Sequence, residues 1–203
     1  MSASLRVIIA EDQAMVLGAL AALIQLEPDM HVIDQVRDGT DAIRAVMEKR
    51  PDILLADIEM PGLSGIDLTR ALKQRGVATK IIILTTFARP GYLQRALEAG
   101  ASGYLLKESP SRELAAAIRR VHAGEQVVNP RLAAEALVDR DPLTNRERQV
   151  LQLVEGGASS GEIATMLRLS KGTVRNHLSQ AITKLAANSR VDAARIAKLK
   201  GWL

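Results

Sequence analysis

The stretch Leu5-Arg-Val-Ile-Ile-Ala10, followed directly by Glu11 and Asp12, indicates the fold class. It is short and rich in β-branched residues, as is typical of a buried strand that runs into a loop. Apolar residues at helical spacing follow from Met15 to Ile24, until Glu27-Pro28-Asp29 ends the pattern. A strand followed by a helix is the repeating unit of parallel sheets that are covered on both faces.

The same alternation recurs along the chain to about residue 123. Ser109 is the expected N-cap of the last helix in this series, with Pro110 at its first helical position. The pattern predicts an α/β fold with a doubly wound, five-stranded parallel sheet. Besides the first pair, strands are expected at 31–36, 53–56, 80–84 and 102–106, and helices at 41–48, 66–75, 91–99 and 110–123.

The periodicity changes after Gly124. We interpret residues 125–140 as a connector, partly helical, between a domain at 1–124 and a second domain at 141–203. From Thr144 onward only helical periodicity appears, so the second domain is predicted to be all-α. Its expected helix signals are a capping box at Thr144-Asn-Arg-Glu147, N-caps at Ser160 and Ser170, and a last helix over 191–200.

Composition limits the classes of protein that fit. The chain has 203 residues, 47% hydrophobic and 25% charged, which is typical of a globular protein of two modest domains. No apolar run approaches the ~20 residues that a spanning helix needs, and the first residues lack a signal-peptide pattern, so we expect a cytoplasmic protein without membrane insertion. The absence of cysteine excludes disulfides, thiolate catalysis and cysteine-based zinc sites.

The net charge of +4 is distributed unevenly. Residues 1–140 carry 17 basic and 18 acidic side chains, whereas residues 141–203 carry 10 basic and 5 acidic ones. A basic segment favours nucleic acid or another acidic partner. On charge alone, a merely solvated helical surface is an equally good interpretation.

Polar residues follow the expected strands at the edge of the sheet where ligands of this fold bind. Three carboxylates at one edge repel one another unless a divalent cation neutralises them, and Mg²⁺ prefers such oxygen ligands. A carboxylate beside a metal and an amine can also act as a nucleophile toward a phosphoryl group. The residues that follow the strands are Glu11 and Asp12, Asp57, Thr85 and Lys107.

Across residues 5–123 the chain resembles the flavodoxin-like receiver domain of response regulators, with the signature positions filled in order. The resemblance implies that Asp57, in Asp57-Ile-Glu-Met-Pro-Gly62, is the phosphoacceptor and that Lys107 contacts the phosphoryl group. It implies Mg²⁺ as the cofactor, held by Glu11, Asp12, Asp57 and the backbone carbonyl of Glu59. It also implies that Thr85 acts at the site and forms, with Tyr104, the switch between inactive and active surfaces. Tyr104-Leu-Leu-Lys-Glu-Ser-Pro110 resembles the NarL/FixJ subgroup.

Residues 143–201 resemble the LuxR-type helix-turn-helix, through Leu143-Thr-Asn-Arg-Glu147, Thr173-Val-Arg-Asn-His177 and Lys184-Leu185. Within the second of these motifs, apolar residues at helical spacing should face the core. The resemblance implies that the polar face contacts DNA, through Lys171, Thr173, Arg175, Asn176, His177 and Ser179. Arginine can pair with guanine and asparagine with adenine, although phosphate contacts are the commoner kind, and for Lys171 and Arg175 both remain open.

Together these features predict a two-component response regulator that is not an enzyme. A sensor histidine kinase would phosphorylate Asp57, and phosphorylation would promote homodimerisation and sequence-specific binding to promoter DNA. The segments 81–92 and Gly201-Trp202 resemble the thermosensing branch that regulates fatty-acid desaturation, which implies a desaturase promoter and a membrane-embedded kinase.

Two alternatives are considered. An aspartyl-phosphate phosphatase of the haloacid-dehalogenase type also uses an acidic Mg²⁺ site, but its Asp-x-Asp motif is replaced by Asp57-Ile-Glu59. A DNA-binding module that works without phosphorylation would leave the acidic pocket without a role.

Overall fold

The computed structural model describes residues 4–86, 89–138 and 141–203. The chain forms two compact units: the larger contains the sheet and extends to Ala134, and the smaller contains the helices from Glu135 onward. Among the described residues, no helix combines the length and the apolar character needed to cross a bilayer.

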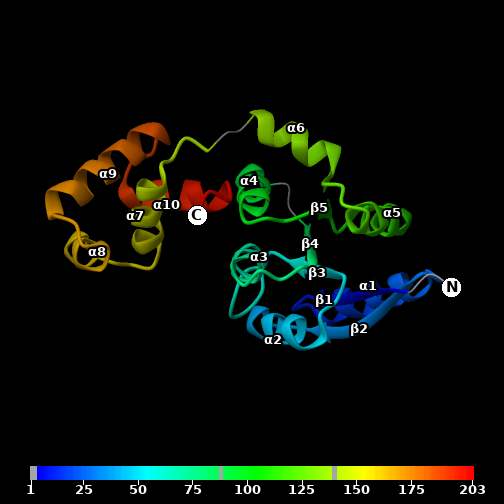
Figure 1. Cartoon of the computed structure of the whole chain (residues 1–203). Coiled ribbons are helices and arrows are strands. Elements are labelled where there is room, and N and C mark those ends of the chain that lie inside the picture. The colour runs from blue at the N-terminus through cyan, green and yellow to red at the C-terminus, as the bar shows by residue number, and fades with distance from the viewer. Residues whose placement is uncertain (1–3, 87–88, 139–140) are drawn as a thin grey trace. The chain divides into compact units, whose positions relative to one another are not determined.

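The larger unit is built on a parallel sheet with the strand order β2-β1-β3-β4-β5-β6 (Figure 1). The chain starts in the middle of the sheet, moves to one edge and then returns past β1, which is the doubly wound arrangement that the sequence predicts. The five predicted strands are confirmed as β1 (Leu5–Ala10), β2 (Met30–Val36), β3 (Ile53–Asp57), β4 (Lys80–Thr85) and β5 (Gly103–Leu106).

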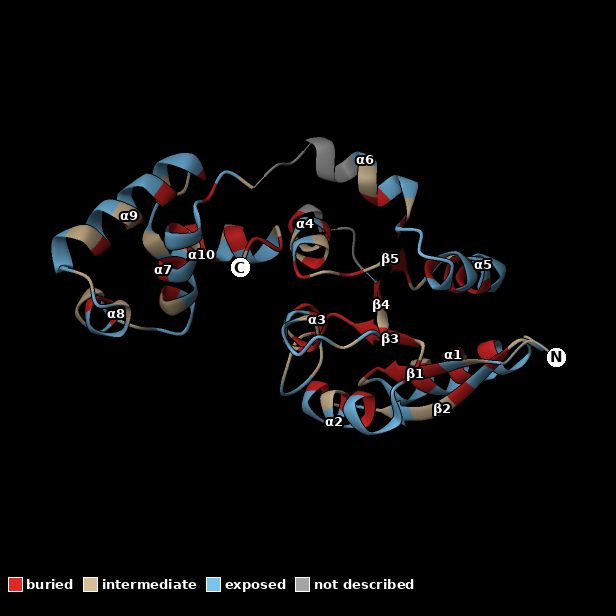
Figure 2. Cartoon of the chain, viewed as in Figure 1, coloured by how far each residue is buried: buried red, intermediate tan, exposed pale blue. Residues whose placement is uncertain are grey.

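Helices cover this sheet because its central strands are apolar on both sides. Alternate side chains such as Val7, Ile9 and Leu55 form one core cluster with α1 and α5. Helices α2 and α3 contact the strands and each other. Burial of β1, β3 and β4 is nearly complete (Figure 2). The helices are α1 (Ala14–Gln25), α2 (Gly39–Lys49), α3 (Gly65–Gln74), α4 (Pro90–Glu98) and α5 (Ser111–His122).

The structure corrects the sequence interpretation at two places near the connector. A sixth strand, β6 (Val127–Val128), pairs in parallel with β5, so part of the predicted connector belongs to the sheet, and α6 (Pro130–Val138) follows it. Two residues are too few for a periodic signal. Helix α5 begins one residue later than predicted, because Pro110 is its N-cap and Ser109 lies before it.

The smaller unit has the helices α7 (Asn145–Glu155), α8 (Ser160–Leu167), α9 (Lys171–Lys184) and α10 (Arg190–Leu199) around one apolar cluster. The predicted capping box at Thr144 and Glu147 and the predicted N-cap at Ser170 are confirmed. The N-cap of α8 is Ser159 rather than Ser160, and Ser159 forms a second capping box with Glu162. Two serines in sequence offer the same side chain, and the backbone decides which one caps.

Candidate functional site

The larger unit brings the predicted acidic residues together at the carboxyl ends of its strands. One carboxylate oxygen from each of Glu11, Asp12 and Asp57 lies within 4.8 Å of the others. Glu11 and Asp57 are almost fully buried, at 1% and 6% exposure. They meet because β1 and β3 are neighbours in the sheet, and Glu11 and Asp12 directly follow β1 while Asp57 ends β3.

Lys107 supplies the positive charge in this pocket. Its Nζ lies 2.6 Å from Oε2 of Glu11 and 3.0 Å from Oδ1 of Asp57, and the side chains are almost completely buried. The backbone N–H of Ile58 also donates to Oδ1 of Asp57, at 2.8 Å. The lysine therefore bridges two carboxylates that would otherwise repel each other.

The pKa values of these groups reflect burial and mutual charge. Burial raises the pKa of the Asp57 carboxyl above its ordinary value, against the opposing effect of Lys107, and the negative charge of Glu11 raises it further. For Lys107, burial alone lowers the pKa, but the pairs with Glu11 and Asp57 outweigh it and raise the pKa above its usual range. The raised pKa of Lys107 keeps its ammonium charged beside Oδ1 of Asp57, and shifted pKa values of this kind are typical of functional sites.

The acidic cluster fits a divalent cation. Oδ1 of Asp12 is buried and finds no hydrogen-bond partner within the described part of the chain. A buried carboxylate oxygen without a donor is costly unless a cation or water completes its environment. The donor set is oxygen only, as Mg²⁺ prefers. Glu59, whose backbone carbonyl is predicted as a further ligand, is exposed two residues after Asp57.

The structure places the two predicted switch residues close to this edge of the sheet, on adjacent strands. Thr85 ends β4 and is 4% exposed, and its backbone carbonyl accepts from the N–H of Lys107. Tyr104 lies in β5 and is fully buried, and its carbonyl accepts from the N–H of Asn129 beyond β6. The strand that carries the tyrosine is thus bonded on one side to the site and on the other to the connector.

One residue that contacts the loop of the acidic pocket was not identified from the sequence. Arg37, directly after β2, donates from its guanidinium to the backbone carbonyl of Asp12 at 2.8 and 3.0 Å. This contact holds the loop that carries the two acidic residues. The rule used for the other strands, which examines the residue after each strand end, also points to this position.

In the smaller unit, the predicted DNA-contacting residues lie on α9. Its buried side is formed by Val174, Leu178 and Ala181, with Ile182 half-buried and the C-cap Leu185 buried as well, so the polar residues face outward. Thr173 and His177 are half-buried at the margin. The other four predicted residues, Lys171, Arg175, Asn176 and Ser179, are exposed.

Helix α9 is attached to α7 by an ion pair between the partly exposed Lys184 and the buried Glu147. Nζ of Lys184 lies 2.7 and 2.9 Å from the carboxylate oxygens of Glu147, which is fully buried and also caps α7 through the N–H of Thr144. A carboxylate that accepts from both a backbone N–H and an ammonium is well compensated for its burial. This pair fixes the position of α9 relative to α7.

Known families match both halves of the chain. Residues 7–119 match the response regulator receiver domain, and residues 141–197 match the bacterial regulatory proteins of the luxR family. The predicted resemblance to the NarL/FixJ subgroup, which implies a receiver domain followed by a LuxR-type helix-turn-helix, agrees with these two matches.

Individual proteins are similar over almost the whole length. The chain is 49% identical over 196 residues to the transcriptional regulatory protein DesR of Bacillus subtilis (strain 168), covering 97% of this chain and 98% of DesR. It is 48% identical over 199 residues to the transcriptional regulatory protein YvfU of the same strain, covering 98% and 100%. A solved structure of two RcsB dimers bound to two parallel DNAs is 25% identical, with a TM-score of 0.68 and coverage of 98% and 100%.

Proposed function

Because the chain belongs to the two-component response regulators with a LuxR-type DNA-binding domain, we propose that phosphorylation of Asp57 controls its binding to promoter DNA. The observation that carries this proposal is the buried pocket in which Asp57 lies 3.0 Å from Lys107 and beside two further carboxylates. In this proposal residues 1–124 form the receiver and 141–203 bind DNA, and residues 125–140, whose strand β6 extends the receiver's sheet, connect the two.

The chemistry is phosphoryl transfer from a histidine of a sensor kinase. An oxygen of the Asp57 carboxylate forms a bond to phosphorus, and the bond between phosphorus and the imidazole nitrogen breaks, leaving its electron pair on nitrogen. Lys107 already contacts Oδ1 of Asp57, so its ammonium is positioned to stabilise negative charge on the transferred group. Asp57 reacts as the ionised carboxylate, so no proton has to leave its side chain when the bond to phosphorus forms.

Receiver domains generally bind Mg²⁺ at an acidic pocket. In this chain Glu11, Asp12, Asp57 and the carbonyl of Glu59 would hold the ion, and when bound it would supply charge neutralisation for the phosphoryl oxygens. Thr85 and Tyr104 are proposed to transmit the change at Asp57, since they lie on the two strands that follow β3 in the sheet.

For the kinase as partner, support comes from the surface beside the pocket. Helix α1 begins three residues after Glu11 and contains no charged residue over its whole length. Its exposed side includes Met15 and Leu23, with 89% and 39% exposure, and its C-cap Leu26 is 79% exposed. An uncharged, apolar exposed face next to a reaction site is the kind of surface that a protein partner covers.

For the DNA-binding step, support comes from the basic second domain and the exposed polar face of α9. The RcsB structure contains dimers on DNA, and we propose the same assembly here, with phosphorylation favouring the dimer. Transcription is regulated where the chromosome is, so the proposal places the protein in the cytoplasm.

The set of target genes is proposed to include membrane-lipid desaturation genes, on the similarity to DesR. YvfU is as similar to this chain, so the name of one relative does not select the regulon by itself. Mapping of binding sites across the genome, with and without the kinase, is the test. Peaks at promoters unrelated to lipid desaturation would refute this part.

The central proposal is tested by incubation with Mg²⁺ and a small phosphodonor such as acetyl phosphate. A stable mass increase of one phosphoryl group, absent in Asp57→Asn, is expected because the amide keeps the shape but is not a nucleophile. The same phosphorylated protein should bind operator DNA more tightly. Rapid turnover of the donor without a stable adduct would favour the phosphatase alternative, and unchanged DNA affinity of the phosphorylated protein would favour a module that works without phosphorylation.

A separate comparison tests the partner surface. Met15→Glu should slow phosphorylation by the kinase but leave phosphorylation by acetyl phosphate unchanged, because only the kinase has to cover α1. His31→Glu, at an exposed position of β2, is the control. Equal effects on both donors would show that the substitution disturbs the pocket itself.

A further inference from the structure

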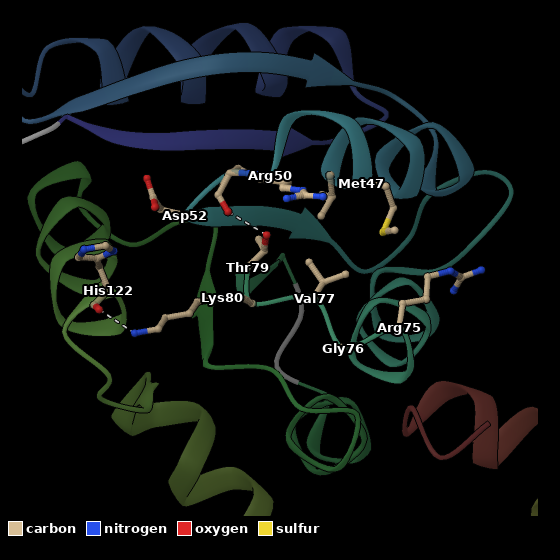
Figure 3. A pocket seen from close by; sticks show the side chains of 12 residues that line it. Met47, Arg50, Asp52, Arg75, Gly76, Val77, Thr79, Lys80 and His122 are labelled. Atoms are coloured by element: carbon tan, nitrogen blue, oxygen red, sulfur yellow. Dashed lines mark hydrogen bonds between the residues drawn. The ribbon is translucent and has the colours of Figure 1, made fainter.

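A cavity of about 490 Å³ lies in the larger unit, away from the acidic pocket. Figure 3 shows the side chains that line it. It is bordered by the residues just before β3 and β4 and by the C-terminal ends of α2, α3 and α5. Asp52 lines the cavity directly before the first residue of β3, and Asp57 is the last residue of that strand, so at about 3.3 Å per residue the two sites are roughly 17 Å apart. The volume lies within the ~300–1,000 Å³ of small-molecule sites.

One part of the cavity wall is apolar. Met47 and Val77 face it together with Pro51, and Met47 is 46% exposed although it is a large hydrophobic residue. The loop between α3 and β4 is held in place by a hydrogen bond from the hydroxyl of Thr79 to the carbonyl of Pro51. This bond joins the loop to the residues just before β3, the two backbone segments that border the cavity.

The remainder of the wall is cationic. Arg50, Arg75 and Lys80 line the cavity, and Figure 3 shows Arg75 and Lys80 on opposite sides of it. Two of these side chains donate hydrogen bonds to backbone carbonyls: Arg75 donates to the carbonyl of Ala71, and Lys80 donates to the carbonyl of His122 at 2.7 Å. The guanidinium of Arg50 has no acceptor among the residues that the structure describes.

Only one acidic side chain lines the cavity. Oδ2 of Asp52 accepts from the backbone N–H of Arg6 at 2.8 Å, and no ion pair joins Asp52 to a cation in the described ranges. Counting Asp52 against Arg50, Arg75 and Lys80, the cavity carries an excess of two positive charges.

This excess contrasts with the rest of the same domain. Several exposed arginines elsewhere on its surface are paired with carboxylates, as in Arg70 with Asp67 and Arg119 with Glu27 and Asp29. Beside the cavity the cations instead repel one another: the pKa of Lys73 is lowered, first by burial and then by the charge of Lys80. The larger unit has nearly balanced charge overall, so the positive charge here is local.

We propose that this cavity is a binding site for a small organic phosphate with an apolar or aromatic body. A phosphoryl group carries about −1.5 to −2 charge near neutral pH, which matches the local excess, and arginine binds phosphate through paired donors. The apolar body would cover Met47 and Val77. This site is separate from Asp57 and does not depend on the function proposed for that residue.

The test uses the ¹⁵N-labelled full chain in EDTA, so that no metal recruits phosphate to the acidic pocket. Phenyl phosphate and inorganic phosphate are titrated separately and followed by amide chemical shifts. We expect saturable shifts at Gly76, Val77 and Thr79 with phenyl phosphate, and at least tenfold weaker binding of inorganic phosphate, which lacks the apolar body.

Two variants test the assignment. Arg50→Gln combined with Lys80→Gln should weaken phenyl phosphate binding at least tenfold, because both substitutions remove a charge from the wall. Met47→Glu changes an already exposed side chain, which should leave folding intact, and it should also abolish binding. Arg44→Gln, on the same helix but in a pair with Asp41, is the matched control and should bind as the parent does.

Several outcomes would overturn the proposal. It is refuted if phenyl phosphate causes no saturable shifts or causes shifts only in the smaller unit. It is also refuted if the cavity variants bind phenyl phosphate with unchanged affinity. Equal binding of the two phosphates would mean an adventitious ion only. Saturable shifts at the same amides with a tetraglutamate peptide, but not with phenyl phosphate, would instead identify an acidic protein partner.

Discussion

Asp12 is the residue of the acidic pocket whose contribution to Mg²⁺ binding can best be measured separately from other effects. Unlike Glu11 and Asp57, it makes no ion pair with Lys107, and its Oδ1 is buried without a donor in the described structure. We expect Asp12→Ala to weaken Mg²⁺ binding at least about tenfold, since even the loss of an outer partner of a metal site has that effect. Isothermal titration calorimetry of Mg²⁺ into the full chain measures this change.

The control for this prediction is Glu48→Gln, which removes an exposed carboxylate from α2 of the same domain. It should leave Mg²⁺ affinity unchanged. If Asp12→Ala and Glu48→Gln bind the ion equally well, Asp12 is not a ligand, and the buried oxygen requires a water molecule instead.

At the scale of elements, the pair between Glu147 and Lys184 determines how firmly α9 is held. Glu147→Gln should destabilise the helical unit by about 1 to 3 kcal/mol, because Lys184 loses its partner and the capping interaction is weakened. Trp202 is the only tryptophan and packs in the core of this unit, so its fluorescence during urea unfolding reports the change. Glu155→Gln removes an exposed pair with Lys198 and should change stability by less than about 0.5 kcal/mol.

The same pair predicts a dependence on pH. Burial by itself raises the pKa of Glu147, but the hydrogen bonds from Lys184 and Thr144 outweigh it, and the folded-state pKa lies below the ordinary 4.5. The carboxylate therefore stabilises the folded state above pH 4.5, and this contribution is lost as the pH falls through the lower folded-state value. Urea unfolding of the parent and of Glu147→Gln should differ at pH 7 and converge in acid. A difference that persists at low pH would assign the stabilisation to packing.

Helix α9 as a DNA-contacting element makes a prediction about specificity. Arg175 is exposed on the polar face, and Arg175→Ala should cost about 1 to 3 kcal/mol at the operator if the side chain contacts a base. Fluorescence anisotropy with operator and with random DNA separates the two interpretations that the sequence leaves open. An equal loss on both DNAs would identify a phosphate contact. Arg195→Ala, an exposed arginine of α10 paired with Asp192, serves as the control.

At the scale of the whole molecule, a change at Asp57 can alter DNA affinity only if the phosphorylated chain favours a state that binds DNA differently. Dimerisation provides such a state, because two linked helix-turn-helix units occupy two half-sites and the second contact becomes intramolecular. We expect a monomer without phosphodonor, a dimer with it, and an operator with half-sites about one helical turn apart.

Sedimentation velocity at several concentrations measures the first two expectations, and footprinting measures the third. Asp57→Asn should remain monomeric under both conditions. A sedimentation coefficient and an operator affinity that both stay constant in protein shown to be phosphorylated would contradict the proposed coupling.

The alternation of apolar strands and amphipathic helices was sufficient to predict a doubly wound parallel sheet and the positions of its first five strands, because the central strands are buried on both faces and their composition is constrained along most of their length. The same holds for α9 and its C-cap, where the buried residues Val174, Leu178 and Leu185 follow the helical period. The convergence of Glu11, Asp12, Asp57 and Lys107 could also be predicted, because parallel strands end at one edge. The sequence by itself therefore determined which residues meet at that edge.

Tertiary structure alone decided features that depend on distance and orientation rather than on period. The two-residue strand β6 exists only because β5 offers it an edge, and Ser159 rather than Ser160 caps α8 because of the local backbone angles. The ion pair between Glu147 and Lys184 joins residues 37 positions apart, so no local sequence pattern predicts it. The cationic cavity around Arg50 and Lys80 is likewise invisible in the sequence, because only folding separates these cations from the carboxylates that balance them in the overall charge.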